Sequence, residues 1–219
     1  MRGAANPTAR WERRYRDAVD AAAEAFAEKG YLGASTGDIA DRLGIRQGSL
    51  YYYFASKDAA LAAVCQLGVE AFVEQMRRIL VGPDAAAEKL RAVIANHLSP
   101  LRTRPEGDYV KVFLSHRHDL PDGPRQLIAG LALSYERMIE RLFGEGVASG
   151  QLRADLDPRL ATLALLGLCN SVIGARQTPR PARIDAIIAA YGDMLVDGVA
   201  RPAATNKKRR REGTGCASD

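Results

Sequence analysis

The stretch GIRQGSLYYYFASKD, residues 44–58, places three tyrosines and a phenylalanine directly after a glycine-containing segment and before a lysine. At about 100° per residue, the side chains of this segment divide between two faces of a helix. The face that we expect to be buried holds Leu50, Tyr53 and Phe54. Tyr51 and Tyr52 then point outward, and paired exposed tyrosines indicate a surface that contacts a partner.

The composition is that of a soluble globular protein of one or two domains. The chain has 219 residues, of which 47% are hydrophobic and 26% charged, so it can bury a real core. No run approaches the roughly 18 apolar residues of a membrane span, and the first 17 residues lack the apolar region of a secretory signal. Three widely separated cysteines argue against a disulfide framework. We therefore expect a cytoplasmic protein without a membrane contact.

The formal net charge of +5 invites a nucleic-acid interpretation, but most of the excess lies in the tail. Residues 1–57 hold nine Lys/Arg and seven Asp/Glu, and residues 58–200 hold sixteen and seventeen. Residues 201–219, which include KKRRR, hold six basic and two acidic residues. Net charge is therefore weak support for DNA binding by the folded part, and the placement of individual residues has to carry that argument.

Nearly every periodic segment predicts a helix, so the fold class is all-α. We expect a helix-turn-helix domain over residues 8–56, a bundle of longer helices over 57–200, and a disordered basic tail over 201–219. The expected helices cover approximately 8–29, 36–43, 47–54, 57–80, 85–98, 106–117, 123–149, 158–175 and 182–199.

A helix-turn-helix unit is predicted within residues 36–54. Two helices that cross steeply need a small residue at their closest approach, a glycine in the turn and an apolar residue that locks the pair. Ala40, Gly44 and Leu50 meet these needs in order. We expect Thr36 to cap the first helix and to hold a phosphate with its hydroxyl.

The outward face of the second helix carries groups suited to DNA. The phenols of Tyr51 and Tyr52 can donate to phosphate oxygens, and Gln47 and Ser49 can bond base edges. Gly48 allows a close approach to a groove, and Lys57 stands at a helix start that already favours anions. Two alternatives stay open, since the spacing also arises by chance in α proteins and the aromatic run is also typical of a buried cluster.

The segment AAAEAFAEKGYLGASTGDIADRLGIRQGSLYYYFASKDAALAAV, residues 21–64, closely resembles the N-terminal domain of the TetR family, the tetracycline repressor-like regulators. The resemblance covers roughly residues 15–67. It implies a homodimer whose recognition helices enter successive major grooves of a near-palindrome, with half-sites about one helical turn or slightly more apart. It also implies that Arg46, Gln47, Gly48 and Ser49 face bases, whereas Thr36, Tyr51, Tyr52 and Lys57 contact the backbone.

The same resemblance implies that the bundle binds a small effector and that its last two helices form the dimer interface. Residues 135–172 resemble a subgroup linked to lipid or acyl-thioester metabolism, although GARQTPRP stands where that subgroup has an aromatic stretch. A small hydrophobic or acyl-type effector is therefore expected. The candidate ligand-binding residues, which are also typical of plain core, are Phe72, Met76, His97, Tyr109, Phe113, Tyr135 and Met138.

The histidines of the segment HRH, residues 116–118, raise the alternative of a metal site. Their i, i+2 spacing makes the two side chains diverge on a helix, whereas helical metal sites prefer i, i+3 or i, i+4. Paired carboxylate–histidine motifs, phosphate loops and nucleophile elbows are missing from the sequence. We expect no metal, no cofactor and no enzymatic activity, with an all-α metal-dependent enzyme as the distant alternative.

The sequence therefore predicts a ligand-responsive transcriptional repressor that binds a palindromic DNA operator as a homodimer. An activator, or a ligand-independent regulator of the same fold, is the nearer alternative. A bare interaction module that uses YYYF as a protein contact is a further one.

Overall fold

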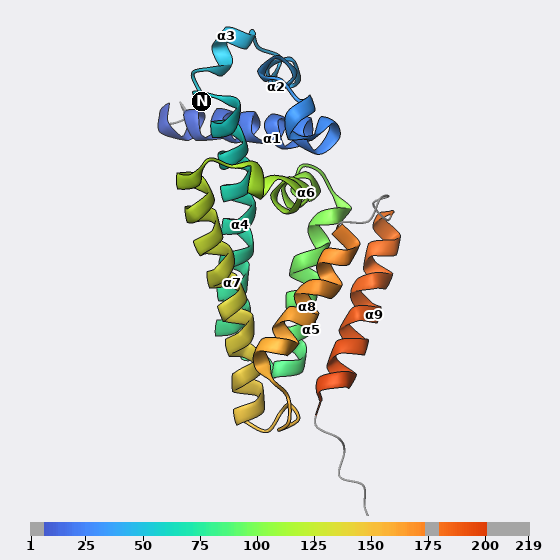
Figure 1. Cartoon of the computed structure of the whole chain (residues 1–219). Coiled ribbons are helices and arrows are strands. Elements are labelled where there is room, and N and C mark those ends of the chain that lie inside the picture. Colours follow the sequence, from blue (N-terminus) through green and yellow to red (C-terminus); the bar gives the residue numbers. More distant parts are fainter. Residues whose placement is uncertain (1–6, 174–179, 201–219) are drawn as a thin grey trace, which may run out of the picture.

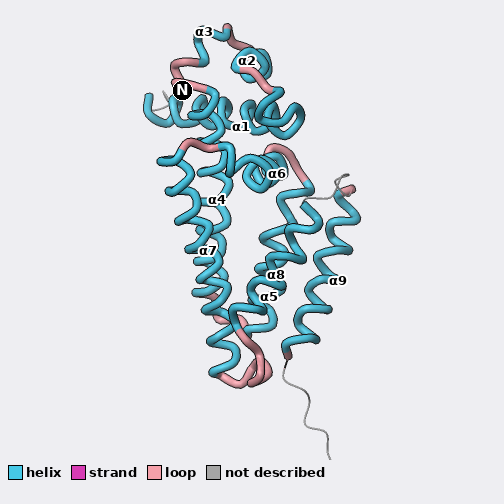
Figure 2. The backbone as a smooth tube through the Cα atoms, in the orientation of Figure 1, coloured by secondary structure: helices cyan, strands magenta, loops and turns pink. Residues whose placement is uncertain are grey.

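A computed structural model describes residues 7–173 and 180–200 of the chain, and these residues are almost entirely helical (Figures 1 and 2). An isolated antiparallel bridge joins Leu152 to Ala200. The elements are α1 (Pro7–Gly33), α2 (Thr36–Leu43), α3 (Gln47–Leu50), α4 (Lys57–Val81), α5 (Ala86–Leu98), η1 (Ser99–Arg102), α6 (Glu106–His116), η2 (Arg117–Asp119), α7 (Asp122–Ala148), α8 (Pro158–Ile173) and α9 (Pro181–Val199).

The all-α prediction is confirmed, and most helix ends fall within two residues of their predicted positions. α1 changes direction at Gly30, whose φ of 70° and ψ of 166° interrupt the helix where the glycine stop was predicted. The prediction for α3 was too long, because this helix ends at Leu50 and a turn follows. The predicted tail over 201–219, the loop at 176–181 and the last residues of the helix predicted to reach 175 lie wholly or partly outside the described residues.

Helices α1–α3 and the first turns of α4 form a small unit that we call the head. Its core joins the apolar stripe of α1, which includes Phe26, to buried residues of the next three helices: Ile39 of α2, Leu50 of α3 and Leu61 of α4. This core continues into Val112 of α6 and Ile128 of α7. The head is therefore packed onto the rest of the molecule through α4, α6 and α7, and the domain boundary expected near residue 57 stays a prediction.

The rest of α4 and helices α5–α9 form the larger unit that we call the body. In Figure 1, α4 and α7 run side by side, and α5, α8 and α9 form the opposite side. Its core contains Met76, Leu90 and Phe143, all with no exposed surface. At the lower end Gly146 is needed, because a Cβ there would lie 2.6 Å from Cδ1 of Leu152.

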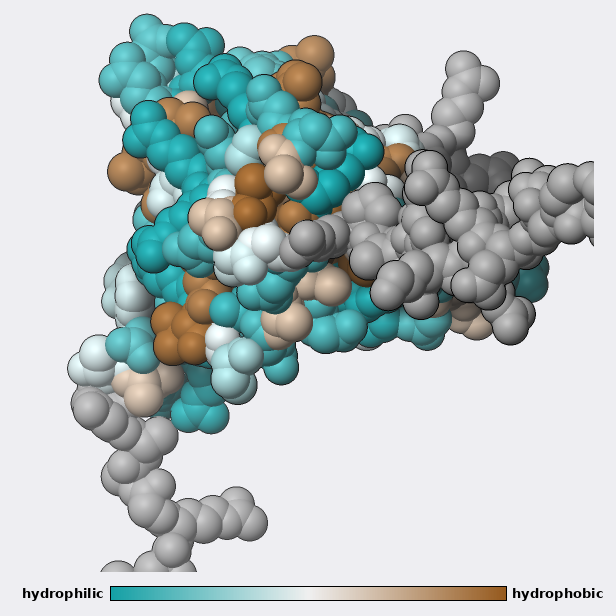
Figure 3. Space-filling view, turned by 90° about the horizontal axis from the view of Figure 1, so that it is seen from below, coloured by the Kyte–Doolittle hydropathy of each residue, from teal (hydrophilic) through white to brown (hydrophobic). Residues whose placement is uncertain are grey.

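One helix of the described residues, α4, is long and apolar enough to cross a membrane by length and composition alone. It contributes to the cores of both head and body, with Leu61, Val64 and Met76 buried. Its apolar character is thus that of a central core helix. Seen from below, the molecule shows separate hydrophobic patches within a mainly hydrophilic face (Figure 3).

Candidate nucleic-acid interface and ligand cavities

Ser35, and not Thr36, caps α2. The Ser35 hydroxyl accepts from the Asp38 amide at 3.1 Å, and the Asp38 carboxylate accepts from the Ser35 amide at 2.8 Å. This reciprocal pair is a capping box. The predicted cap was wrong by one residue, because serine and threonine are adjacent here and both are good caps. The Thr36 hydroxyl instead accepts from Nε2 of Gln47 at 2.8 Å.

The turn between α2 and α3 forms as its glycine predicts. Gly44 adopts φ 68° and ψ 34°, the left-handed region that glycine enters at little cost. Its amide donates to the Asp41 carbonyl at 3.1 Å, and the Ile45 amide donates to the Ala40 carbonyl at 3.0 Å. Ala40 is 1% exposed, so the small residue does stand where the helices approach. The helix-turn-helix prediction is confirmed.

The side chains of α3 and the turn after it divide into buried and exposed groups, largely as expected. Leu50 and Phe54 are buried, whereas Tyr51 is 56% and Tyr52 is 72% exposed. Tyr53, expected in the core, is half-buried, and its ring meets the Tyr52 ring edge-on at 5.4 Å. The tyrosines lie in a turn and not in a helix: the amides of Tyr52 and Tyr53 donate to carbonyls three residues earlier, at 3.2 and 2.9 Å.

The groups predicted to meet bases project from this surface into open space. Arg46, Gln47, Gly48 and Ser49 are all exposed, and a Cβ added at Gly48 would meet no atom within 4 Å. The arrangement offers a guanidinium, an amide and a hydroxyl beside two phenols, all of which suit hydrogen bonding to a duplex. The assignment of these residues to DNA stays a prediction.

Lys57 points toward the head itself. Its ammonium donates to the carbonyls of Tyr31 at 2.9 Å and Ala34 at 3.1 Å, and it lies 4.4 Å from the centre of the Tyr31 ring. Two of its three protons are therefore engaged at the end of α1. In this geometry the residue fixes the position of α4 against α1, and one proton remains for the phosphate predicted for it.

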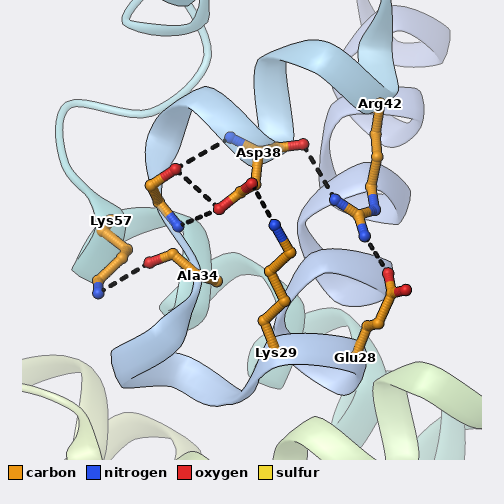
Figure 4. A network of polar contacts seen from close by, with 7 residues as sticks. Glu28, Lys29, Ala34, Asp38, Arg42 and Lys57 are labelled. Atoms are coloured by element: carbon orange, nitrogen blue, oxygen red, sulfur yellow. Dashed lines mark hydrogen bonds and ion pairs between the residues drawn. The ribbon is translucent and has the colours of Figure 1, made fainter.

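A polar network holds α2 to α1 beside this site (Figure 4). Lys29 pairs with the Asp38 carboxylate, and Arg42 joins the Asp38 carbonyl to Glu28. Hydrogen bonds from Lys29 and Ser35 hold the pKa of Asp38 well below its usual range. The carboxylate therefore stays ionised, which keeps the capping box intact throughout the neutral and mildly acidic range.

Two cavities lie in the upper part of the body. The first, which we call the α1-side cavity, measures about 280 Å³ and is lined by residues of α1, α4, α5 and α6, including Arg16 and Asp20. The second, which we call the His97 cavity, measures about 120 Å³ and lies among α4, α5, α6, α7 and α8. Both are lined by Phe72 and Val110, so these two side chains stand between them.

The His97 cavity contains a buried aromatic and polar cluster. Nδ1 of His97 lies 3.0 Å from the Tyr135 hydroxyl, and Phe72 packs against both rings. Burial lowers the pKa of His97 to about 4 despite the opposing influence of Asn170. Burial also raises the pKa of Tyr135. Both groups are neutral near pH 7, so they suit an uncharged hydrogen-bonding ligand.

The structure brings together most of the predicted ligand residues but not all. Phe72, His97, Phe113 and Tyr135 line the His97 cavity, and Tyr109 lines the α1-side cavity. The two methionines do not join them, because Met76 has no exposed surface in the core and Met138 borders an open groove between α4 and α7.

Two asparagines were missed by the sequence reasoning. Nδ2 of Asn96 and Oδ1 of Asn170 are buried and make no hydrogen bond of normal geometry within the described residues, although the two amides stand close enough to Tyr135 and His97, respectively, to influence their pKa. Asn96 lines the α1-side cavity and Asn170 the His97 cavity. A buried unpaired amide costs about 1–3 kcal/mol, which a ligand or water can recover. The signal in the sequence was an asparagine within an otherwise apolar helical stretch.

Direct contacts connect the head to α6, whose residues line both cavities. The Tyr109 hydroxyl on α6 donates to Asp20 on α1 at 2.6 Å. The amide of Tyr31, just after the break at Gly30, donates to Nε2 of His116 at 3.3 Å. Movement of α6 would therefore act on α1 directly, in addition to any movement of α4.

Of the two histidines in the segment HRH, His116 makes contacts within the protein and His118 does not contribute to the core. Nδ1 of His116 lies 2.9 Å from Asp119, and His118 is exposed. Among the residues that the structure describes, no group of three or more His, Cys, Asp or Glu side chains is placed to hold a metal ion.

The comparisons with known proteins cover both units of the chain. Residues 18–64 match the model of bacterial regulatory proteins of the tetR family, and residues 83–199 match the model of the tetracyclin repressor-like C-terminal domain. The second match alone spans more than half of the chain.

Two named regulators with similar sequences are consistent with these family matches. The fatty acid metabolism regulator protein of Bacillus subtilis is 28% identical over 162 residues, 73% of this chain and 81% of that protein. The transcriptional repressor KstR2 of Rhodococcus jostii is 25% identical over 194 residues, 84% of this chain and 90% of that protein.

A solved structure extends the likeness to the fold. The crystal structure of AibR in complex with isovaleryl coenzyme A and operator DNA superposes with a TM-score of 0.71 at 25% identity, covering 84% of this chain and 98% of that one. With the helix-turn-helix geometry and family matches over both units, this chain belongs to the TetR family of transcriptional regulators.

Proposed function

We propose that the protein is a ligand-responsive transcriptional repressor of the cytoplasm that binds a near-palindromic operator as a homodimer and is released by a hydrophobic, acyl-type effector. The observation that carries this proposal is that the same chain has both an exposed polar face on its helix-turn-helix and cavities in its helical bundle. The exposed groups of α3 and the following turn suit a duplex, and two cavities lie on the body side of α1.

An apolar stripe on α8 and α9 supports the homodimer. Leu160 and Leu163 of α8 are 64% and 55% exposed, and Met194 of α9 is 53% exposed. Leu160, Leu163 and the exposed Gly167 recur at helical spacing and therefore share one face of α8. A contiguous apolar face of this kind is typical of a subunit interface.

The neutral cluster of the His97 cavity supports an acyl-type effector. Aliphatic and aromatic side chains suit an acyl chain, and His97 and Tyr135 offer hydrogen bonds to an uncharged carbonyl. Among the relatives, the names of the Bacillus subtilis regulator and of the AibR complex refer to fatty acids and to an acyl-coenzyme A.

Release requires that the effector bind the two conformations of the protein with different affinity. Such coupling typically amounts to about 1–3 kcal/mol. In this chain the coupling has three physical routes: α4, which runs through both units, the Tyr109–Asp20 bond and the Tyr31–His116 bond.

The test has two stages. A duplex is first recovered by the protein from a random library, and its release is then titrated with acyl-coenzyme A thioesters of increasing chain length, with free coenzyme A as the control. We expect release by a thioester at concentrations where free coenzyme A has no effect. Failure to recover a duplex contradicts DNA binding, whereas binding that no thioester weakens contradicts the acyl effector.

A reporter fused to the recovered site decides the sign of regulation. Higher expression after deletion of the gene supports repression, and lower expression identifies an activator.

A further inference from the structure

We propose that α1 carries a second DNA-binding surface, an arginine face formed by Arg10 and Arg14 that binds the phosphodiester backbone flanking the site read by α3. The inference rests on the proposed DNA-binding function and adds a contact outside the helix-turn-helix. Three observations carry it: unpaired charge, orientation, and attachment to the recognition element.

The charge of this face is not neutralised by the protein. Both arginines are exposed, and within the described residues they form no ion pair or hydrogen bond. Asp17 lies on the same face and leaves an excess of positive charge. Most arginines of the body are paired with acidic neighbours, as in the pairs of Arg78 with Glu74, Arg91 with Asp193, Arg102 with Asp185, Arg125 with Asp122 and Arg141 with Glu145.

The face points to the side of α1 on which α2 stands. Arg10 and Glu28 are 18 residues apart, which is about five full turns, so both project in the same direction. Glu28 is bound to Arg42 of α2. Arg14 is one turn from Arg10 and shares this direction. The two arginines therefore lie on the side of α1 that carries α2, about 27 Å along the helix from Glu28.

Aromatic stacking fixes this part of α1 to the recognition element. The rings of Trp11 and Tyr15 stack with centroids 5.2 Å apart, and the Tyr15 ring lies 5.9 Å from that of Phe54. Phe54 directly follows the turn that presents Tyr51 and Tyr52. In Figure 1 the first turns of α1 accordingly lie beneath the connection between α3 and α4. A duplex seated on α3 would continue past this edge of the head.

The chemistry of the face suits a phosphate backbone. Guanidinium groups bind phosphate oxygens through paired hydrogen bonds, and they keep their charge at every physiological pH. Such contacts add affinity at any sequence but carry no base information. The arginine face is therefore expected to strengthen binding to DNA that extends beyond the recognised site.

The test compares Arg10→Ala/Arg14→Ala with the charge-matched control Arg78→Ala/Arg137→Ala, which removes exposed arginines from α4 and α7 of the body. The probe is the duplex recovered by the wild-type protein, with about ten base pairs of flanking DNA at each end and without them. Dissociation constants are measured by fluorescence anisotropy between about 50 and 200 mM NaCl. Circular dichroism verifies the fold, since alanine is a good helix former at exposed sites.

We expect binding of the flanked duplex by Arg10→Ala/Arg14→Ala to be at least about tenfold weaker, with a logarithmic salt slope smaller by about 3.6 for four lost contacts per dimer. This variant should also bind the duplexes with and without flanking DNA equally well. The control Arg78→Ala/Arg137→Ala should keep the wild-type salt slope and the wild-type preference for the flanked duplex. Unchanged slope and flank preference in the folded variant overturn this inference alone. A wild-type chain that binds no duplex overturns the proposed function and this inference together.

Discussion

At the scale of the residue, the surface proposed to bind DNA presents two kinds of group, phenols suited to the phosphate backbone and an amide suited to a base edge. Tyr51 and Tyr52 present exposed phenols, whereas Gln47 presents an amide held by Thr36. A phenol can anchor the backbone but cannot distinguish bases there, whereas an amide can bond a base edge in the major groove. Substitutions at these positions should therefore have different signatures.

We expect Tyr52→Ala to weaken binding to all sequences alike, by about 1.5–3 kcal/mol per head if its hydroxyl bonds a phosphate. Gln47→Ala should instead relax the preference at one base position of each half-site, with about 1–3 kcal/mol lost for the preferred base. Gel-shift titrations over a set of single-base operator variants check both. Tyr52→Phe, which removes only the hydroxyl, is the control for ring contacts, and the reverse pattern of effects would contradict these roles.

His97 should make stability depend on pH. Burial lowers its pKa from 6.5 to about 4, so between these values the unfolded chain binds a proton that the folded chain does not. Stability is therefore lost as the pH falls from about 6.5 to 4, by up to about 3 kcal/mol from this group. Urea unfolding of wild type and His97→Leu across this range should show a shallower dependence for the variant. The exposed His118→Leu is the control, and equal slopes for wild type and His97→Leu would rule out the effect.

At the scale of the element, the stability of the short helices α2 and α3 comes from their caps and their packing, because both are too short to be stable alone. α2 has eight residues and α3 has four, which is too short for stability in isolation. The capping box at Ser35 and the left-handed Gly44 fix the ends of α2, and Leu50 packs α3 onto the head core. The sequence predicted this unit well because caps and turns are local, but two adjacent hydroxyl residues left the cap ambiguous.

The identity of the cap can be tested with a matched pair of variants. Ser35→Ala removes the group that accepts from the Asp38 amide, and we expect a loss of about 1 kcal/mol in the free energy of unfolding. Thr36→Ala removes no cap and should change stability less, while it frees the Gln47 side chain. Chemical denaturation measures both. A larger loss for Thr36→Ala than for Ser35→Ala would return the cap to Thr36.

At the scale of the whole molecule, DNA binding at two half-sites requires two heads in a fixed relation. The exposed apolar stripe on α8 supplies the proposed interface, and the stripe lies in the body, which also holds both cavities. In the proposed dimer, an effector that shifts α6 or α4 would therefore alter the spacing of the heads without breaking the interface.

We expect Leu163→Arg to give a monomer, because it places a charge in the proposed interface, and to weaken operator binding by at least about tenfold because the second head no longer adds to binding. Leu127→Arg is a matched control, since Leu127 of α7 is also 55% exposed. Analytical ultracentrifugation gives the oligomeric state. If both variants remain dimeric, the interface is not on this face of α8.

The sequence by itself determined the helical fold, the helix-turn-helix and the division of the aromatic run into buried and exposed residues. These features follow from periodicity, turn glycines and local spacing, which act over a few residues. Only the tertiary structure decided that Met76 belongs to the core, that Lys57 holds the end of α1, and that Asn96 and Asn170 line cavities. It also decided which way the arginines of α1 face. Such outcomes depend on which helices meet across long separations in the chain, and packing between them is not encoded in any short stretch.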